Sequence, residues 1–191
     1  MNRKIISAAF ITLFLLSACY QKSLNPFYSE ETLIQLPELE GVWVDNNQYR
    51  ITIERVDGFR YLMTAEEAEG PSKAELSVHV FQLFQTTFMD VCVKDIDPES
   101  TNSYYAYNVT PTHNVFKVEH LEGEWVLKPL LSKWTEDMIS NGILNIGSVK
   151  TNQDERILTG STEELQNLLA YSLQDPEAYD DGDPIIWSRP E

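Results

Sequence analysis

The side chains that could perform acid–base or metal chemistry are few, and their spacing does not bring them together. The sequence contains three histidines, His79, His113 and His120. In an extended strand, His113 and His120 would point to opposite faces, so they could not share a metal ion. The chain also lacks the short motifs of hydrolases, metallopeptidases and nucleotide-binding proteins. We therefore predict a protein that is not an enzyme and that has no catalytic residue and no cofactor.

Cys92 is a candidate nucleophile, because it could form a thiolate. It lies between two valines in the segment FMDVCVKD. A reactive thiol needs an electropositive setting, whereas the charged neighbours Asp90 and Asp95 are acidic. We therefore expect Cys92 to be a buried, inert thiol that is protected from thiol reagents in the folded protein.

The segment DPEAYDDGD, residues 175–183, packs five carboxylates into nine positions. An EF-hand loop would need Asp or Asn where Glu177 and Tyr179 stand. A solvated acidic loop is the default interpretation of such a run. The alternative is a looser calcium site made of Asp180, Asp181 and Asp183.

The amino terminus has the pattern of a secretion signal. The basic start MNRK is followed by an apolar run from Ile5 to Leu16. That run is too short for a transmembrane helix, which needs about 20 residues. The run ends in Leu16-Ser17-Ala18-Cys19, which resembles the lipobox of bacterial lipoproteins. The alternative is an ordinary secretory signal in which the cysteine is incidental.

The lipobox resemblance implies a cellular location as well as a covalent modification. Residues 1–18 would be a signal peptide, and Cys19 would carry two thioether-linked acyl chains plus, usually, an amide-linked one such as palmitate. Two or more chains are enough for stable anchoring in a membrane. Tyr20, instead of Asp, follows the cysteine. In these lipoproteins that implies the outer membrane, with the protein on its periplasmic side.

Charge limits the partners of the processed chain. Without residues 1–18 it would hold 12 Lys and Arg against 30 Asp and Glu, a formal charge of −18. Such a surface repels phosphates, which excludes nucleic-acid binding. It would also be repelled by anionic lipid, so the lipid on Cys19 is the membrane attachment that we expect. With Cys19 alkylated, Cys92 has no partner in the same chain for a disulfide.

Residues 19–38 contain prolines at 26 and 37 and show no sustained hydrophobic period. We expect a lipidated tether or a loosely docked arm, with a single folded domain over residues 39–191. From there, short runs alternate apolar and polar residues, which is the pattern of strands. Strands are expected at 41–45, in a hairpin over 49–65, and at 74–84, 87–96, 103–111, 114–121, 124–131 and 184–188. Glu122-Gly123 would form a second hairpin turn. A meander of about eight strands favours a closed, antiparallel up-and-down barrel, because closure removes exposed edges.

The register of the first hairpin follows from its turn. A three-residue loop of Val56, Asp57 and Gly58 would pair Arg55 with Phe59, Ile53 with Tyr61 and Ile51 with Met63. This register gathers apolar side chains on one face of the hairpin. With Trp43, they are our candidate ligand pocket: Trp43, Tyr49, Ile51, Ile53, Phe59, Tyr61 and Met63.

Helical periodicity is confined to the C-terminal third. A short helix is expected over residues 131–142. A second is expected over 161–174, where Ser161 and Glu164 form a capping box and a stripe of leucines faces the core. We expect these one or two short helices to lie on or across the barrel.

Gly41-Val42-Trp43 opens the first expected strand and resembles the G-x-W motif of lipocalins. A helix followed by a last short strand is also similar, although TNSYY at 101–105 departs from the later T-D-Y signature of that family. The resemblance spans residues 39–188 loosely and implies a barrel that carries a small apolar ligand or lipid. Our first prediction is nevertheless a non-catalytic structural or protein-interaction module that docks on an envelope protein, and the lipocalin-like carrier is the alternative. The many aromatic residues favour a filled barrel or a narrow pocket.

Overall fold

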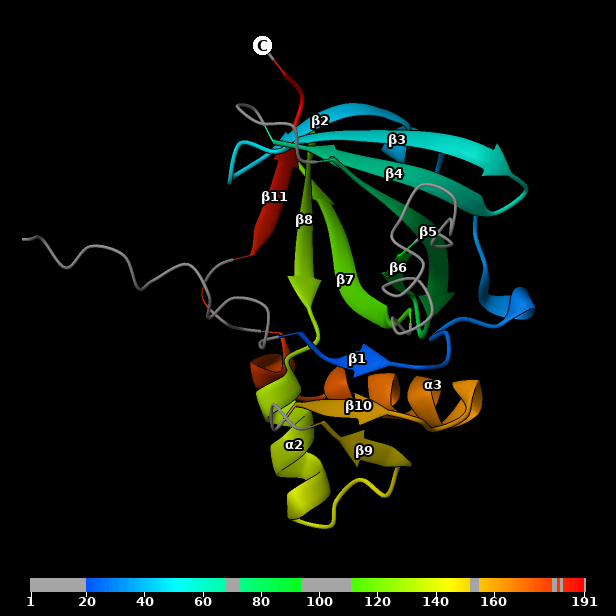
Figure 1. The fold of residues 1–191 in the computed structure, drawn as a ribbon, viewed down its shortest axis with the longest axis vertical. Helices are drawn as coiled ribbons and strands as arrows, with labels where there is room; N and C mark the ends of the chain where they lie inside the picture. Colours follow the sequence, from blue (N-terminus) through cyan, green and yellow to red (C-terminus); the bar gives the residue numbers. More distant parts are fainter. Residues whose placement is uncertain are drawn as a thin grey trace, which may run out of the picture.

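The computed structural model describes residues 20–67, 73–93, 111–151, 155–179, 182 and 184–190. Within these residues, eight antiparallel strands close into an up-and-down barrel (Figure 1). They are β2 (Gly41–Asp45), β3 (Arg50–Asp57), β4 (Arg60–Glu66), β5 (Lys73–Leu83), β6 (Thr86–Val93), β7 (His113–Leu121), β8 (Glu124–Pro129) and β11 (Ile185–Ser188). Each strand pairs with the next, and β11 pairs with β2 to close the barrel. The predicted fold class is confirmed, and the final strand supplies the closing pair.

Alternation along the strands explains the barrel core. Successive side chains of a strand point to opposite faces, so every second residue enters the interior. On β3, for example, Ile51 and Ile53 are buried, whereas Arg50 and Glu54 are exposed. The buried interior includes Trp43, Tyr61, Val78, Val80, Met89, Val118, Trp125, Leu127 and Trp187.

The register predicted for the β3–β4 hairpin is wrong by two residues. Ile53 pairs with Met63 and Ile51 with Ala65, and a bulge lies between Arg55 and Asp57. The turn consists of Gly58 and Phe59, and Asp57 pairs with Arg60. The bulge takes up Val56, which the three-residue loop had placed in the turn. Because the register shifts by an even number of residues, each side chain stays on the face of the sheet where it was predicted.

Residues 20–38, which we call the arm, are docked on the rest of the fold. The arm contains β1 (Lys22–Ser23), the 3-10 helix η2 (Glu30–Thr32) and the first two residues of η3 (Pro37–Leu39). β1 pairs with β7, and Phe27 is fully buried. Farther along, the Ile34 amide donates to the Val80 carbonyl at 3.0 Å. The folded part therefore includes residues 20–38, because apolar side chains of the arm such as Phe27, Ile34 and Leu36 are packed against the two cores.

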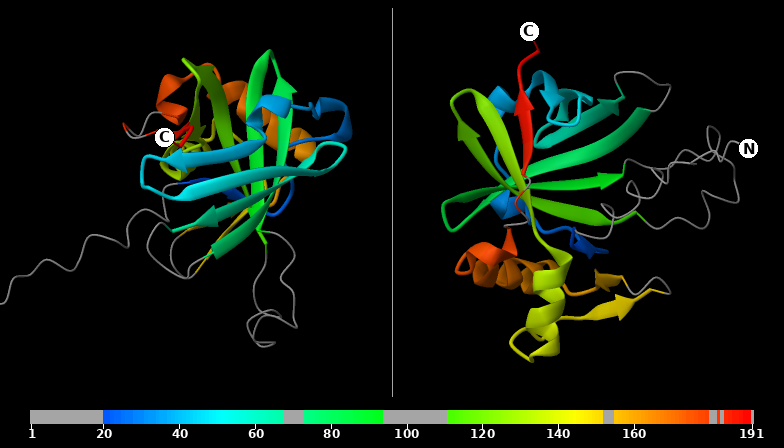
Figure 2. Two further views of the ribbon diagram at one scale, coloured as in Figure 1. Left: turned by 90° about the horizontal axis from the view of Figure 1, so that it is seen from above. Right: turned by 90° about the vertical axis from the view of Figure 1, so that its left-hand side faces the viewer.

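A second layer packs beside the barrel. It consists of α2 (Ser132–Ser140), β9 (Ser148–Lys150), β10 (Arg156–Leu158), α3 (Thr162–Ser172) and η4 (Pro176–Ala178). β1 joins this layer to the barrel, since it pairs with β7 on one side and β10 on the other. Figures 1 and 2 show both helices on the same side of the barrel as β9 and β10. A separate apolar core fills the space between: Phe27, Phe81, Phe88, Val115, Leu130, Trp134, Leu144, Ile146, Leu158, Leu165, Leu168, Leu169, Ala178 and Tyr179.

Local signals placed both helices correctly. The capping box of α3 is confirmed, since Ser161 Oγ accepts from the Glu164 amide at 3.3 Å and the Glu164 carboxylate accepts from the Ser161 amide at 2.7 Å.

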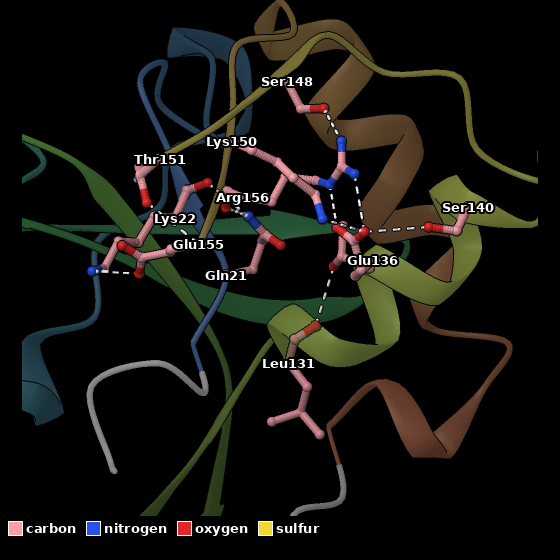
Figure 3. Close-up of polar contacts among 11 residues, drawn as sticks. Gln21, Lys22, Leu131, Glu136, Ser140, Ser148, Lys150, Thr151, Glu155 and Arg156 are labelled. Carbon is pink, nitrogen blue, oxygen red and sulfur yellow. Dashed lines mark hydrogen bonds and ion pairs between the residues drawn. The ribbon is translucent and has the colours of Figure 1, made fainter. Parts of the chain in front are cut away.

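The two short strands β9 and β10 were not predicted. A charged network holds them to α2 (Figure 3). Arg156 and Lys150 both contact the Glu136 carboxylate, with Lys150 Nζ at 3.2 Å from Oε1.

Candidate ligand-binding cup in the barrel

One end of the barrel is closed by the arm. The indole Nε1–H of Trp43 donates to the Leu39 carbonyl at 2.8 Å, and the amide of Leu36 donates to the Tyr61 hydroxyl at 2.8 Å. Leu39 is fully buried, and Ile34 and Leu36 pack against the barrel core. These contacts cover this end of the barrel with residues 34–39.

The G-x-W segment is held by an arginine from the other end of the chain. The Arg189 guanidinium lies 3.6 Å from the centroid of the Trp43 ring and donates to the carbonyls of Val42 and Glu40. It also lies against Gly41, where a Cβ would collide with it. Gly41 has φ 123°, a conformation that favours glycine. The glycine and the tryptophan of this motif therefore have separate structural roles.

The opposite end of the barrel holds a cavity of about 530 Å3, which we call the cup. Its apolar lining includes Ile51, Met63, Ala65, Leu76, Val91, Phe116, Leu127, Ile185 and Trp187. Polar lining residues come from strand ends and the arm: Lys22, Asp45, Tyr49, Thr112 and Asn114. Small-molecule sites typically enclose about 300–1,000 Å3, with mostly apolar walls and a few polar groups. The cup therefore suits a ligand with an apolar body and a polar end.

The structure divides the predicted pocket residues into three groups. Tyr49, Ile51 and Met63 line the cup. Trp43, Ile53 and Tyr61 are at most 2% exposed and do not line it, because they fill the barrel toward its closed end. Phe59 is 40% exposed in the hairpin turn and does not line the cup.

Sequence reasoning missed the part of the cup that comes from later strands and from the arm. Phe116, Leu127 and Trp187 lie on β7, β8 and β11, and Tyr20 precedes β1. The alternation of apolar and polar residues identified these strands. It did not show which half of the barrel each inward-facing side chain would occupy. The arm showed no sustained hydrophobic period, and the contacts that dock it are made with distant residues such as Asp90 and Leu130.

A buried ionic pair lies on the outer wall of the barrel. Asp90 is fully buried, and its carboxylate accepts from the Phe27 amide at 2.9 Å and binds His113 Nδ1 at 2.7 Å. Burial alone would lower the pKa of His113, but the hydrogen bonds to Asp90 and Cys92 outweigh it and raise that pKa to about 10. The imidazole therefore carries a positive charge at neutral pH. The pair fastens the arm to β6 and β7.

Cys92 is half-buried on the same wall, which corrects the expectation of a fully buried thiol. It lines a hollow of about 460 Å3 together with His79 and His113. Its register partner across β6 and β7 is His113. The acidic neighbour on which the sequence argument relied, Asp90, is already paired with that histidine. The charged group next to this thiol is therefore His113, which the pairing of β6 with β7 brings there. The two residues are far apart in the sequence, so the sequence did not show this contact.

His79 lies in the same hollow, against the arm. Its ring stacks on Tyr28 with 4.3 Å between centroids, and burial lowers the pKa of the His79 imidazole. The same burial raises the pKa of Tyr28 to about 12. Both side chains are therefore neutral at neutral pH, and they pack the arm against β5.

Cys19 and the acidic residues Asp180, Asp181 and Asp183 lie outside the described residues. Among the residues that are described, no group of three or more His, Cys, Asp or Glu side chains could hold a metal ion. None of the helices in the described part of the chain has the length and apolar character needed to cross a bilayer. Comparison with known protein families, curated proteins and solved structures found no match for this chain.

Proposed function

We propose that this chain is a lipoprotein of the outer membrane, anchored through Cys19 on the periplasmic side, whose barrel binds a small apolar ligand or lipid. The observation that carries the binding function is the cup, an open apolar cavity of about 530 Å3 opposite an end that the arm has closed. A barrel that served only as a rigid support would gain stability from filling this space. The cup is therefore best explained by a ligand.

The binding function is tested with the chain that starts at Tyr20 and with cis-parinaric acid, a fluorescent fatty acid. Ala65 lines the cup, so Ala65→Phe should fill part of it and weaken binding at least tenfold, which is about 1.4 kcal/mol. Thr64→Phe is the matched control. It adds the same ring to the opposite face of β4 and should leave the affinity unchanged.

Two results would contradict the binding function. One is an absence of fatty-acid binding by the chain that starts at Tyr20. The other is equal weakening by both Phe substitutions, which would mean that the probe does not occupy the cup. A structural or protein-interaction module would then be the better-supported function. Native mass spectrometry of the protein from its own periplasm would test that module, because it would show a co-purifying protein and no lipid.

The anchor is tested separately by Cys19→Ala. The lipid requires the Cys19 thiol, so this variant should accumulate as an unprocessed precursor without the mass of the lipid. Cys92→Ala is the control, since it removes the other cysteine and should still be lipidated. If Cys19→Ala is processed to the mature size and stays with the outer membrane, the protein is not anchored in this way.

A further inference from the structure

The arm contributes to the wall of the cup. Tyr20 and Lys22 both line the cavity, and the Tyr20 ring meets Phe116 edge-on with 5.8 Å between centroids. The backbone around Tyr20 is fixed as well: it forms a bridge with Leu131, and the next amide donates to the Leu130 carbonyl at 2.8 Å. The first described residue is thus part of the cup.

The proposed anchor residue is bonded directly to a residue that lines the cup. Cys19 directly precedes Tyr20 in the sequence, and consecutive Cα atoms are about 3.8 Å apart. A flexible tether of about 20 residues would have let the domain move roughly 25 Å from the membrane and turn freely. The docked arm removes that freedom, because the chain is held from Tyr20 onward. Acyl chains on Cys19 would therefore keep the cup next to the lipid surface.

The lining of the cup fits one hydrocarbon chain with a polar end. Its walls are apolar side chains such as Val91, Phe116 and Trp187, whereas Tyr49 and Asn114 lie at strand ends. Electrostatic attraction to anionic lipids would not hold the domain at the membrane, since the processed chain would carry a formal charge of −18. Apolar burial is then the driving force that the cup can supply.

We propose that the cup opens onto the membrane that holds Cys19 and takes up an acyl chain of a bilayer lipid directly from that membrane. This inference rests on the proposed function, because it requires both the anchor and a binding cup. It adds the source of the ligand and the direction in which the cup opens.

The test uses the lipidated protein in vesicles of phosphatidylcholine whose acyl chains carry bromine, which quenches tryptophan on contact. Trp187 lines the cup and is 4% exposed, so a chain in the cup would quench it. We expect stronger quenching than in unbrominated vesicles. Ala65→Phe should remove at least half of that quenching, and Thr64→Phe should leave it unchanged.

A spacer separates membrane uptake from binding in solution. A Gly–Ser insertion of about 20 residues between Cys19 and Tyr20 would let the cup move roughly 25 Å away from the bilayer. Quenching should fall at least threefold, while the chain that starts at Tyr20 binds cis-parinaric acid as before. Undiminished quenching with the spacer would overturn the proposed orientation.

The remaining outcomes are distinct. If the chain that starts at Tyr20 binds cis-parinaric acid but the lipidated protein shows no quenching that depends on Ala65, the membrane source is wrong and the binding function stands. If the lipidated protein also no longer binds cis-parinaric acid, its own acyl chain fills the cup, which overturns uptake from the bilayer. If the chain that starts at Tyr20 binds no fatty acid, the proposed function itself fails.

Discussion

The Asp90–His113 pair allows a quantitative prediction about stability and pH. Asp90 is fully buried and accepts two hydrogen bonds, from the Phe27 amide and from His113. Asp90→Asn removes the charge but keeps the shape and one acceptor oxygen, so one of the two bonds can survive. Breaking a buried pair by removing one charge costs about 3–5 kcal/mol. Because of the surviving bond, we expect about 3 kcal/mol at pH 6.5.

The cost of Asp90→Asn should depend on pH in one direction. The pKa of His113 is raised from 6.5 to about 10 in the folded protein. The stability that the imidazolium contributes is therefore fully present below pH 6.5, and it is lost as the pH rises from 6.5 to about 10. Without the carboxylate, His113 has no such contribution to lose. The difference between the two proteins should shrink to about 1 kcal/mol at pH 10, the usual value of a neutral hydrogen bond.

Urea unfolding followed by tryptophan fluorescence measures this difference at both pH values. With a slope of about 2 kcal/mol per molar urea, 3 kcal/mol lowers the midpoint by about 1.5 M. Asp57→Asn is the matched control, because Asp57 pairs with Arg60 at 2.7 Å but its side chain is 61% exposed. It should cost less than about 1 kcal/mol at either pH. A cost of Asp90→Asn that is the same at pH 6.5 and pH 10 would refute the charged pair.

Three further predictions concern the rest of the fold. Hydrogen bonding from Arg156 lowers the pKa of Glu136 to about 2, so the stability from this pair is lost as the pH falls from 4.5 toward 2. Because the pair is partly exposed, Glu136→Gln should cost about 1 kcal/mol at pH 6 in low salt and less in 1 M NaCl, as measured by urea unfolding. Ser161→Ala removes the cap of α3 and should cost about 1 kcal/mol by the same measurement, and a cost near zero would contradict the capping role. Cys92 should react with a maleimide in the folded protein, more slowly than in denaturant, and complete protection would restore the buried thiol expected from the sequence.

Several features were determined by the sequence, because nearby residues decide them. Alternation identifies a strand wherever one face is buried, and Glu122-Gly123 forms the predicted turn, since both residues adopt positive φ there. Ser161 and Glu164 start α3 through contacts three residues apart. From these elements the closed barrel follows, because unpaired strand edges are unfavourable.

Other features were decided only by the tertiary structure, because they depend on contacts between residues far apart in the chain. The arm carries little local pattern and is ordered by partners such as Asp90, which lies 63 residues beyond Phe27. The pairing of Cys92 with His113 required the register of β6 against β7. The cup likewise could not be read from alternation, because that pattern fixes only which side chains point inward. Whether those side chains meet at the closed end or leave a cavity depends on how the arm and all eight strands fit together.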